Sequence, residues 1–186
     1  MISTKKSIFV ALTLIFGALM IFPAPASASS ADTIDWQVHN GLRRLYANNP
    51  EARALGRQAK AVLVFPKIVK GGFLFAGAYG EGALVSNGSV VGYYCTSAGS
   101  YGFQAGIEQY GYAMFFMTDS SLRYLNKSHG WAVGTGPTVV IGDNSFAKSI
   151  TTNSLGGDVY AFFFSQRGLM AGMGLQGTKI SRIYPD

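Results

Sequence analysis

The sequence predicts an α+β fold: N-terminal helices packed on a curved, Gly-rich antiparallel sheet, barrel-like or divided into two sheets, with one short inserted helix. Three observations predict this fold class. Two segments before residue 62 repeat apolar residues at helical spacing. Extended apolar segments rich in glycine then continue almost to the end of the chain. Only residues 119–127 return to a helical pattern, with Leu122 and Leu125 facing inward.

The first 28 residues have the composition of a secretory signal peptide. Two lysines precede the apolar residues 8–22, and Ala26-Ser27-Ala28 offers small residues to a signal peptidase. A retained membrane anchor is the alternative, which the prolines after the apolar run disfavour. No cysteine lies near the expected cleavage site, so a lipoprotein anchor is not expected. We therefore expect a periplasmic or secreted protein in which residues 29–186 form one domain.

A first helix is expected over residues 29–49. Ile34, Val38, Leu42 and Leu45 recur at the spacing of one helical face, which should pack on the rest of the domain. The polar residues between them should face solvent.

A second helix is expected to begin at Pro50, after an asparagine N-cap, and to run to about Ala61. Arg53, Arg57 and Lys60 form a basic stripe nearly opposite its apolar side. Such a stripe could lie on an anionic membrane. The residues alone favour the alternative, a core-packed helix with a solvated face, because its apolar side chains are mostly small.

The expected sheet begins with residues 62–65, a short apolar strand that stops at Pro66. A basic turn follows over residues 67–72. Residues 73–85 form a long strand with one bulky face and one face of mostly small residues, which suits a strongly curved or tightly packed sheet. Residues 101–117 form one long strand or two strands joined at a kink.

Two hairpins are expected. Asn87-Gly88 has the residues of a type I′ turn and should join the first pair of strands. The last hairpin should join residues 158–164 to residues 169–183 through a polar turn. Residues 131–141, interrupted by glycine and proline, form an irregular or edge strand, and a polar loop or short strand follows them.

Few residues have the spacing that catalysis or metal binding requires. Residues 172–177 match G-x-G-x-x-G, but a strand pattern rather than a helix follows, which argues against a dinucleotide site. His39 and His129 are isolated in the sequence. Glu81 and Glu108 could form a carboxylate pair, although such residues more often lie on the solvated face of a strand or accept hydrogen bonds from a backbone amide or a tyrosine. We expect no enzymatic activity, no cofactor and no metal.

Basic side chains are placed where the expected strands end. Lys67 and Lys70 follow Pro66, and Arg167 lies in the last hairpin turn. They could hold phosphate or lipid headgroups, or they could be ordinary solubilising charge. The formal net charge of +6 permits attraction to anionic lipid without requiring it, and we expect no nucleic-acid partner. The single cysteine, Cys95, cannot form an internal disulfide and is expected to be a buried thiol.

Several motifs, in order and spacing, resemble the SYLF domain family, a lipid-binding domain of bacterial exported proteins and eukaryotic endocytic proteins. The resemblance covers most of residues 33–183. The matching motifs are AVLVFPKIVKGG at 61–72, YGEG at 79–82, GFQAG at 102–106, MFFMT at 114–118, DVYA at 158–161 and GLMAG at 168–172, with Gly177 after them. One departure is Gly156-Gly157, where a more polar or charged residue would be typical.

The resemblance implies a domain that binds acidic phospholipid, including phosphoinositides in eukaryotic members, partly through an amphipathic and basic N-terminal region. It therefore adds Arg43 and Arg44 to Arg53, Arg57 and Lys60 as expected lipid contacts. Trp36 is expected to insert shallowly into the membrane. Actin binding by some eukaryotic relatives is not carried over to a chain expected to be exported.

Three alternatives stay open. The first is a structural envelope protein, or one that binds an unknown protein partner, without lipid affinity. The second is a small outer-membrane barrel, disfavoured by the helical segments. The third is an enzyme using the two glutamates described above.

Overall fold

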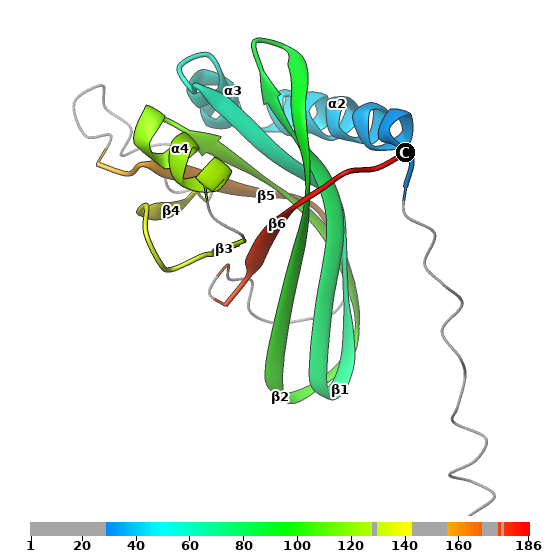
Figure 1. The fold of residues 1–186 in the computed structure, drawn as a ribbon. Helices are drawn as coiled ribbons and strands as arrows, with labels where there is room; N and C mark the ends of the chain where they lie inside the picture. Colours follow the sequence, from blue (N-terminus) through cyan, green and yellow to red (C-terminus); the bar gives the residue numbers. More distant parts are fainter. Residues whose placement is uncertain (1–28, 128–129, 143–155, 169–174, 176) are drawn as a thin grey trace, which may run out of the picture.

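Figure 1 shows a computed structural model of the chain, which describes residues 29–127, 130–142, 156–168, 175 and 177–186. Four of the sequence-based expectations lie outside these residues. They are the signal peptide of residues 1–28, the loop expected after residue 142 (residues 143–155), His129, and residues 169–174 and 176, which include the start of the expected last strand and most of the glycine motif at 172–177.

Two consecutive helices open the described chain, α2 over Ala31–Asn48 and α3 over Pro50–Gly56. Both begin with a side-chain cap: the Thr33 amide donates to Ser30 Oγ at 3.4 Å and the Ala52 amide donates to Asn49 Oδ1 at 2.8 Å. Only the Asn49 cap was expected from the sequence. The buried face of α2 is formed by Ile34, Val38, Gly41 and Leu45.

The second helix is shorter than the sequence predicts. It ends at Gly56 rather than near Ala61, because Ala61 already begins the first strand. The preceding Lys60 amide donates to the Phe116 carbonyl at 2.8 Å, so this residue follows the sheet. Arg57 and Lys60 therefore lie beyond the helix, and the basic stripe is not a helical face.

Two very long antiparallel strands form the centre of the fold, β1 over Ala61–Ser86 and β2 over Ser89–Phe116. The hairpin between them is confirmed: Asn87 and Gly88 both have positive φ, 50° and 81°. The expectation of a turn over residues 67–72 is wrong, because β1 continues through them in register with β2. The chain from residue 101 to residue 116 is likewise part of one strand.

The remaining elements pair around β2. The inserted helix is confirmed as α4, Asp119–Lys127, and the shorter strands are β3 Trp131–Ala132, β4 Val139–Gly142, β5 Val159–Gly168 and β6 Lys179–Ile183. The sheet order is β3-β6-β2-β5-β4, with β1 also paired to β2. All pairs are antiparallel except β4 with β5. The expected last hairpin is wrong, since β5 and β6 each pair with β2 rather than with each other.

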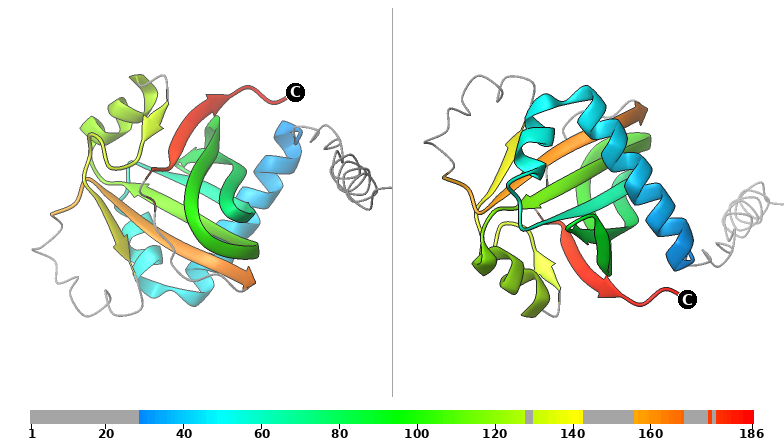
Figure 2. Two further views of the ribbon diagram at one scale, coloured as in Figure 1. Left: turned by 90° about the horizontal axis from the view of Figure 1, so that it is seen from below. Right: turned by 90° about the horizontal axis from the view of Figure 1, so that it is seen from above.

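Both faces of the curled sheet are buried, in two separate cores. Along β1, the side chains of Leu63 and Phe65 enter one core, whereas Val62 and Val64 enter the other. The first core lies inside the curl, where Trp131 of β3 also packs. The second core lies under α2 and α3, which cover the outer face of the sheet (Figure 2). This arrangement confirms the α+β class with N-terminal helices on a curved sheet.

Glycine allows β1 to fold back on itself. A Cβ at Gly82 would lie 2.1 Å from the Val64 carbonyl oxygen, and a Cβ at Gly80 would lie 2.7 Å from the Lys67 carbonyl oxygen. The second half of the strand therefore packs directly on the backbone of the first half. The small-residue face predicted from the sequence is the face that permits this contact.

Candidate functional site

Two β-bulges flank β2 at the same level. In β1, Phe65 pairs with Tyr112 and Ile68 pairs with Tyr110. The two residues between them, Pro66 and Lys67, therefore lie opposite a single residue of β2, which defines a β-bulge. A bulge tolerates the proline, which has no amide proton for the ladder.

The second bulge lies in β5, on the other side of β2. Phe164 pairs with Gly111 and Arg167 pairs with Gln109. The two residues between them, Ser165 and Gln166, therefore lie opposite a single residue of β2. Ser165 has a positive φ of 54°, which turns the strand at this point. The residues that the sequence assigned to a hairpin turn therefore form a bulge within a strand.

Helix α2 crosses directly above both bulges. The helix and the two bulges come close at Gly41, where a Cβ would lie 3.2 Å from Pro66 Cβ and 3.3 Å from the Phe164 ring. The α2 side chains next to Gly41 therefore face the side chains that the bulges of β1 and β5 point toward the helix.

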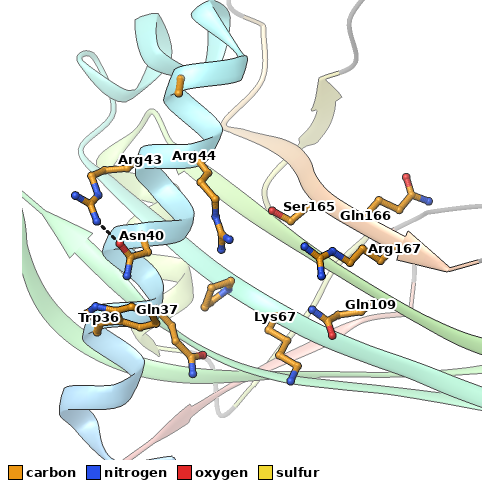
Figure 3. A pocket seen from close by; sticks show the side chains of 12 residues that line it. Trp36, Gln37, Asn40, Arg43, Arg44, Lys67, Gln109, Ser165, Gln166 and Arg167 are labelled. Atoms are coloured by element: carbon orange, nitrogen blue, oxygen red, sulfur yellow. Dashed lines mark hydrogen bonds between the residues drawn. The ribbon is translucent and has the colours of Figure 1, made fainter.

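An open groove of about 890 Å³ lies between α2 and the two bulges (Figure 3). Arg44 on α2 and Arg167 on β5 lie on opposite sides of it, with Lys67 of β1 below them. Its complete lining is Trp36, Gln37, Asn40, Arg43, Arg44, Ala47, Pro66, Lys67, Gln109, Ser165, Gln166 and Arg167.

The groove is strongly cationic. It has four basic side chains and, among the residues that line it, no acidic one. All four basic side chains are exposed, and none has an ion pair within the described part of the chain. Arg43 donates a hydrogen bond to Asn40. The other lining groups are mainly amides and a hydroxyl, so the groove can attract an anion and also donate hydrogen bonds to it.

A buried carboxylate supports one wall of the groove. Glu108 is only 1% exposed, and its Oε1 accepts a hydrogen bond from Gln166 Nε2 at 2.9 Å. Gln166 itself lines the groove, so this bond fixes a wall residue to the sheet.

Glu81 has different partners and does not pair with Glu108. Its Oε1 accepts a hydrogen bond from the Tyr79 hydroxyl at 3.0 Å, and its Oε2 accepts one from the Ser29 amide at 3.1 Å. The expected alternative, hydrogen bonds from a tyrosine and a backbone amide, describes Glu81 correctly. A carboxylate pair for acid–base chemistry is not formed.

The structure brings together some of the predicted lipid contacts and separates others. Arg43, Arg44, Lys67, Arg167 and Trp36 all line the groove. This convergence comes from three elements that are distant in sequence.

Four of the predicted contacts are not part of the groove lining: Arg53, Arg57, Lys60 and Lys70. Lys60 Nζ lies 3.7 Å from Asp119 Oδ2, in an exposed ion pair. Lys70 is half-buried and pairs in register with Glu108, and strand alternation directs it to the inner face of the sheet.

Sequence reasoning missed the polar lining of the groove. One signal was available, because Gln37, Asn40 and Arg44 recur at the spacing of one helical face. No local signal marks Gln109 or Gln166, which reach the groove only through the pairing of β2 with β5.

Cys95 is half-buried rather than fully buried. Burial is the main reason that the pKa of its thiol is raised above the ordinary value, which lowers the thiolate fraction at neutral pH. Within the described ranges, no three histidine, cysteine or acidic side chains come together as metal ligands would. None of the helices in the described part of the chain is long and apolar enough to cross a membrane.

The fold and the groove define a small α+β domain in which N-terminal helices and a curled sheet enclose a basic, solvent-open site. Residues 97–183 match the protein-family model Ysc84, described as "Las17-binding protein actin regulator". This segment belongs to the Ysc84 (SYLF) domain family, which confirms the resemblance found in the sequence motifs.

The family match covers only part of the groove. Gln109, Ser165, Gln166 and Arg167 lie inside the matched segment, whereas the α2 and β1 residues precede it. No curated protein matches the chain.

Proposed function

We propose that this protein binds anionic phospholipid at a membrane surface of the cell envelope, with the cationic groove as the headgroup site. The observation that carries the proposal is the convergence of four basic side chains, from α2, β1 and β5, on one groove without a lining acid. The description of the matched family names protein binding and no reaction, so a binding role also agrees with the family.

The groove has the chemistry that a phosphate-bearing headgroup requires. Arg44 and Arg167 offer planar guanidinium groups that can bind phosphate oxygens in pairs, and Lys67 adds a point charge between them. Each basic residue held near an anionic membrane contributes about 1 kcal/mol of attraction. Trp36, 70% exposed at the groove, has the amphipathic ring that favours the membrane interface.

The first test is co-flotation of the purified protein with vesicles. We expect binding to vesicles of phosphatidylcholine with 30% phosphatidylglycerol (about one anionic lipid in three), and none to phosphatidylcholine alone. Binding should fall steeply as salt is raised, because the attraction is mainly Coulombic. Binding that is equal for both vesicles and unaffected by salt would contradict the proposal.

A matched pair of variants locates the site. The triple variant Arg44→Gln, Lys67→Gln, Arg167→Gln removes three charges from the groove and should weaken binding about 100-fold. The triple variant Arg53→Gln, Arg57→Gln, Lys60→Gln removes the same charge outside the groove and should weaken it far less. Equal losses in the two variants would show diffuse attraction rather than a groove site.

The competing function is a structural or protein-binding role without lipid affinity. The description of the matched family, which names protein binding, agrees with this alternative. If the protein fails to float with any vesicle at any salt concentration, lipid binding is wrong and the protein-binding role takes its place.

A further inference from the structure

We propose that the bend of the β1–β2 pair is an apolar edge that inserts into the same membrane. We call this feature the ribbon bend and define it by Val69, Gly71 and Phe75 of β1 and Ile107 of β2. The inference rests on the proposed function, because the groove and the ribbon bend would contact one bilayer together.

The ribbon bend continues the face on which the groove lies. Gln109, which lines the groove, pairs in register with Val69 of β1 and with Arg167 of β5. Two residues before Gln109 in β2, toward the bend, Ile107 pairs with Gly71. Residues two apart in a strand point to the same side, so Val69 and Ile107 share the outer face with the groove cations.

Among the residues that the structure describes, neither the helices nor the opposite strand covers this face. The buried side chains of α2 pack with Val62 and Val64, and the contact of α2 with β1 at Gly41 reaches Pro66. Figure 1 shows the two strands bending far from α2, α3 and α4. Opposite Ile107, Gly71 has no side chain to cover it, and Ile107 is 74% exposed.

Three large apolar side chains are therefore presented to solvent at this end of the molecule. Besides Ile107, Val69 is 44% exposed and Phe75 is 71% exposed. Single exposed apolar residues are common on soluble proteins, but several that gather beside a basic site indicate a binding surface.

A lipid bilayer fits this surface better than a protein does. Three side chains on a narrow pair of strands fall well short of the roughly 800 Å² per partner that a stable protein interface buries. A membrane needs only shallow burial of a few apolar groups next to cations that meet the headgroups. Lys67 and Arg167 lie at the base of the ribbon bend and would meet the headgroups as the apolar side chains pass them.

The test compares apolar substitutions inside and outside the ribbon bend. The variant Val69→Ser, Ile107→Ser removes two exposed apolar side chains and no charge. We expect its partition onto vesicles with 30% phosphatidylglycerol to fall about tenfold, since each buried methylene group strengthens membrane binding. The control Val91→Ser, Ile141→Ser changes the same residue types at exposed positions elsewhere, 52% and 44% exposed, and should bind as the unchanged protein does.

A depth measurement gives a second readout that does not depend on affinity. In a Cys95→Ser background, Ile107→Cys carries an environment-sensitive dye, and Ile141→Cys is the control. Vesicles containing phosphatidylcholine brominated on its acyl chains should quench the dye at position 107 and not at position 141.

The outcomes separate this inference from the proposed function. If the unchanged protein does not float, both fail. If it floats but the serine variant binds equally and position 107 is not quenched, the groove function stands and membrane insertion by the ribbon bend is wrong. If the serine variant instead converts a dimer into a monomer in sedimentation, with unchanged flotation, the ribbon bend is a contact between copies of the chain.

Discussion

Trp36 and Trp131 are the two tryptophans of the chain, and their environments are opposite. Trp36 is exposed beside the groove, whereas Trp131 is buried and its indole N–H donates to the Thr135 carbonyl at 2.8 Å. Only Trp36 can report a change of solvent at the groove without unfolding of the protein.

We predict that anionic vesicles shift the tryptophan emission to shorter wavelength, because the Trp36 ring moves from water to the membrane interface. The shift is measured by titrating phosphatidylglycerol vesicles into the protein. The variant Trp36→Phe should lose the shift and keep the emission of Trp131. A shift that persists in this variant would place the membrane contact away from Trp36.

Tyr79 makes the protein sensitive to alkaline pH. Burial, followed by the hydrogen bond to Glu81 and the negative charge of that carboxylate, raises the pKa of Tyr79 to about 12. The folded protein therefore favours the neutral phenol. This stabilisation is complete below pH 10, the ordinary pKa of tyrosine, and is lost as the pH rises from about 10 to about 12.

We predict that urea denaturation between pH 9 and pH 11.5 shows a falling stability of the unchanged protein. The fall should be smaller in Tyr79→Phe, which cannot ionise at this position. It should not vanish, because the pKa values of Tyr94 and Tyr110 are also raised, mainly by burial. Identical pH profiles for the two proteins would show that ionisation of Tyr79 does not contribute.

The curl of β1 is the element on which the rest of the sheet depends. Its second half contacts the backbone of its first half at Gly80 and Gly82, with no room for a side chain. The ladder with β2 continues on both halves, so the two strands curl together.

We predict that Gly82→Ala lowers the free energy of unfolding by about 2–3 kcal/mol, because its Cβ would overlap a backbone oxygen that cannot rotate away. Gly77→Ala is the matched control on the same strand, since a Cβ there meets no atom within 4 Å. It should change stability by less than about 1 kcal/mol. Equal effects in urea denaturation would mean that β1 is not tightly packed at Gly82.

Elements with local signals could be predicted from the sequence. The first helix, the capped N-terminus of the second helix and the Asn87-Gly88 turn depend on residues close together in the chain. The two bulges could not be predicted in this way. A proline followed by lysines and glycines is typical of a turn, but pairing of β1 with β2 on either side of Pro66 keeps the strand continuous.

The candidate site depends on the same long-range pairing, which explains why only part of it was predicted. Basic residues at expected turns drew attention to Lys67 and Arg167, and helical periodicity and family resemblance drew attention to α2. Their meeting at one groove requires the bulges on both sides of β2, which no local pattern encodes. Arg57 and Lys60 were misassigned to a helical stripe because the end of α3 depends on where β1 begins.

At the scale of the whole molecule, one side of the sheet carries both the helices and the proposed membrane contact. Helix α2 covers the outer face over one part of β1, and the groove and ribbon bend occupy the part it leaves bare. The opposite face is filled by the inner core, including Trp131 and Leu125. The protein could therefore lie on a membrane by this outer face without exposing either core.

The two ends of the described chain also meet in the folded molecule. The Ala31 amide donates to the Asp186 carbonyl at 3.0 Å, and the Ser29 amide donates to Glu81 Oε2 at 3.1 Å. Cleavage at the predicted site after Ala28 would turn the Ser29 amide into a free ammonium group beside a half-buried carboxylate. A hydrogen bond in which only the carboxylate is charged would then become one between two opposite charges, which is stronger.

We predict that Glu81→Gln lowers the stability of the cleaved chain by about 1 kcal/mol more than that of the uncleaved chain. The measurement is the thermal unfolding of both forms, with mass spectrometry to confirm Ser29 as the first residue of the cleaved one. Equal losses in both forms would contradict this prediction. Glu81 would thus make maturation and folding thermodynamically linked: the fold would be most stable only in a molecule that has completed its export.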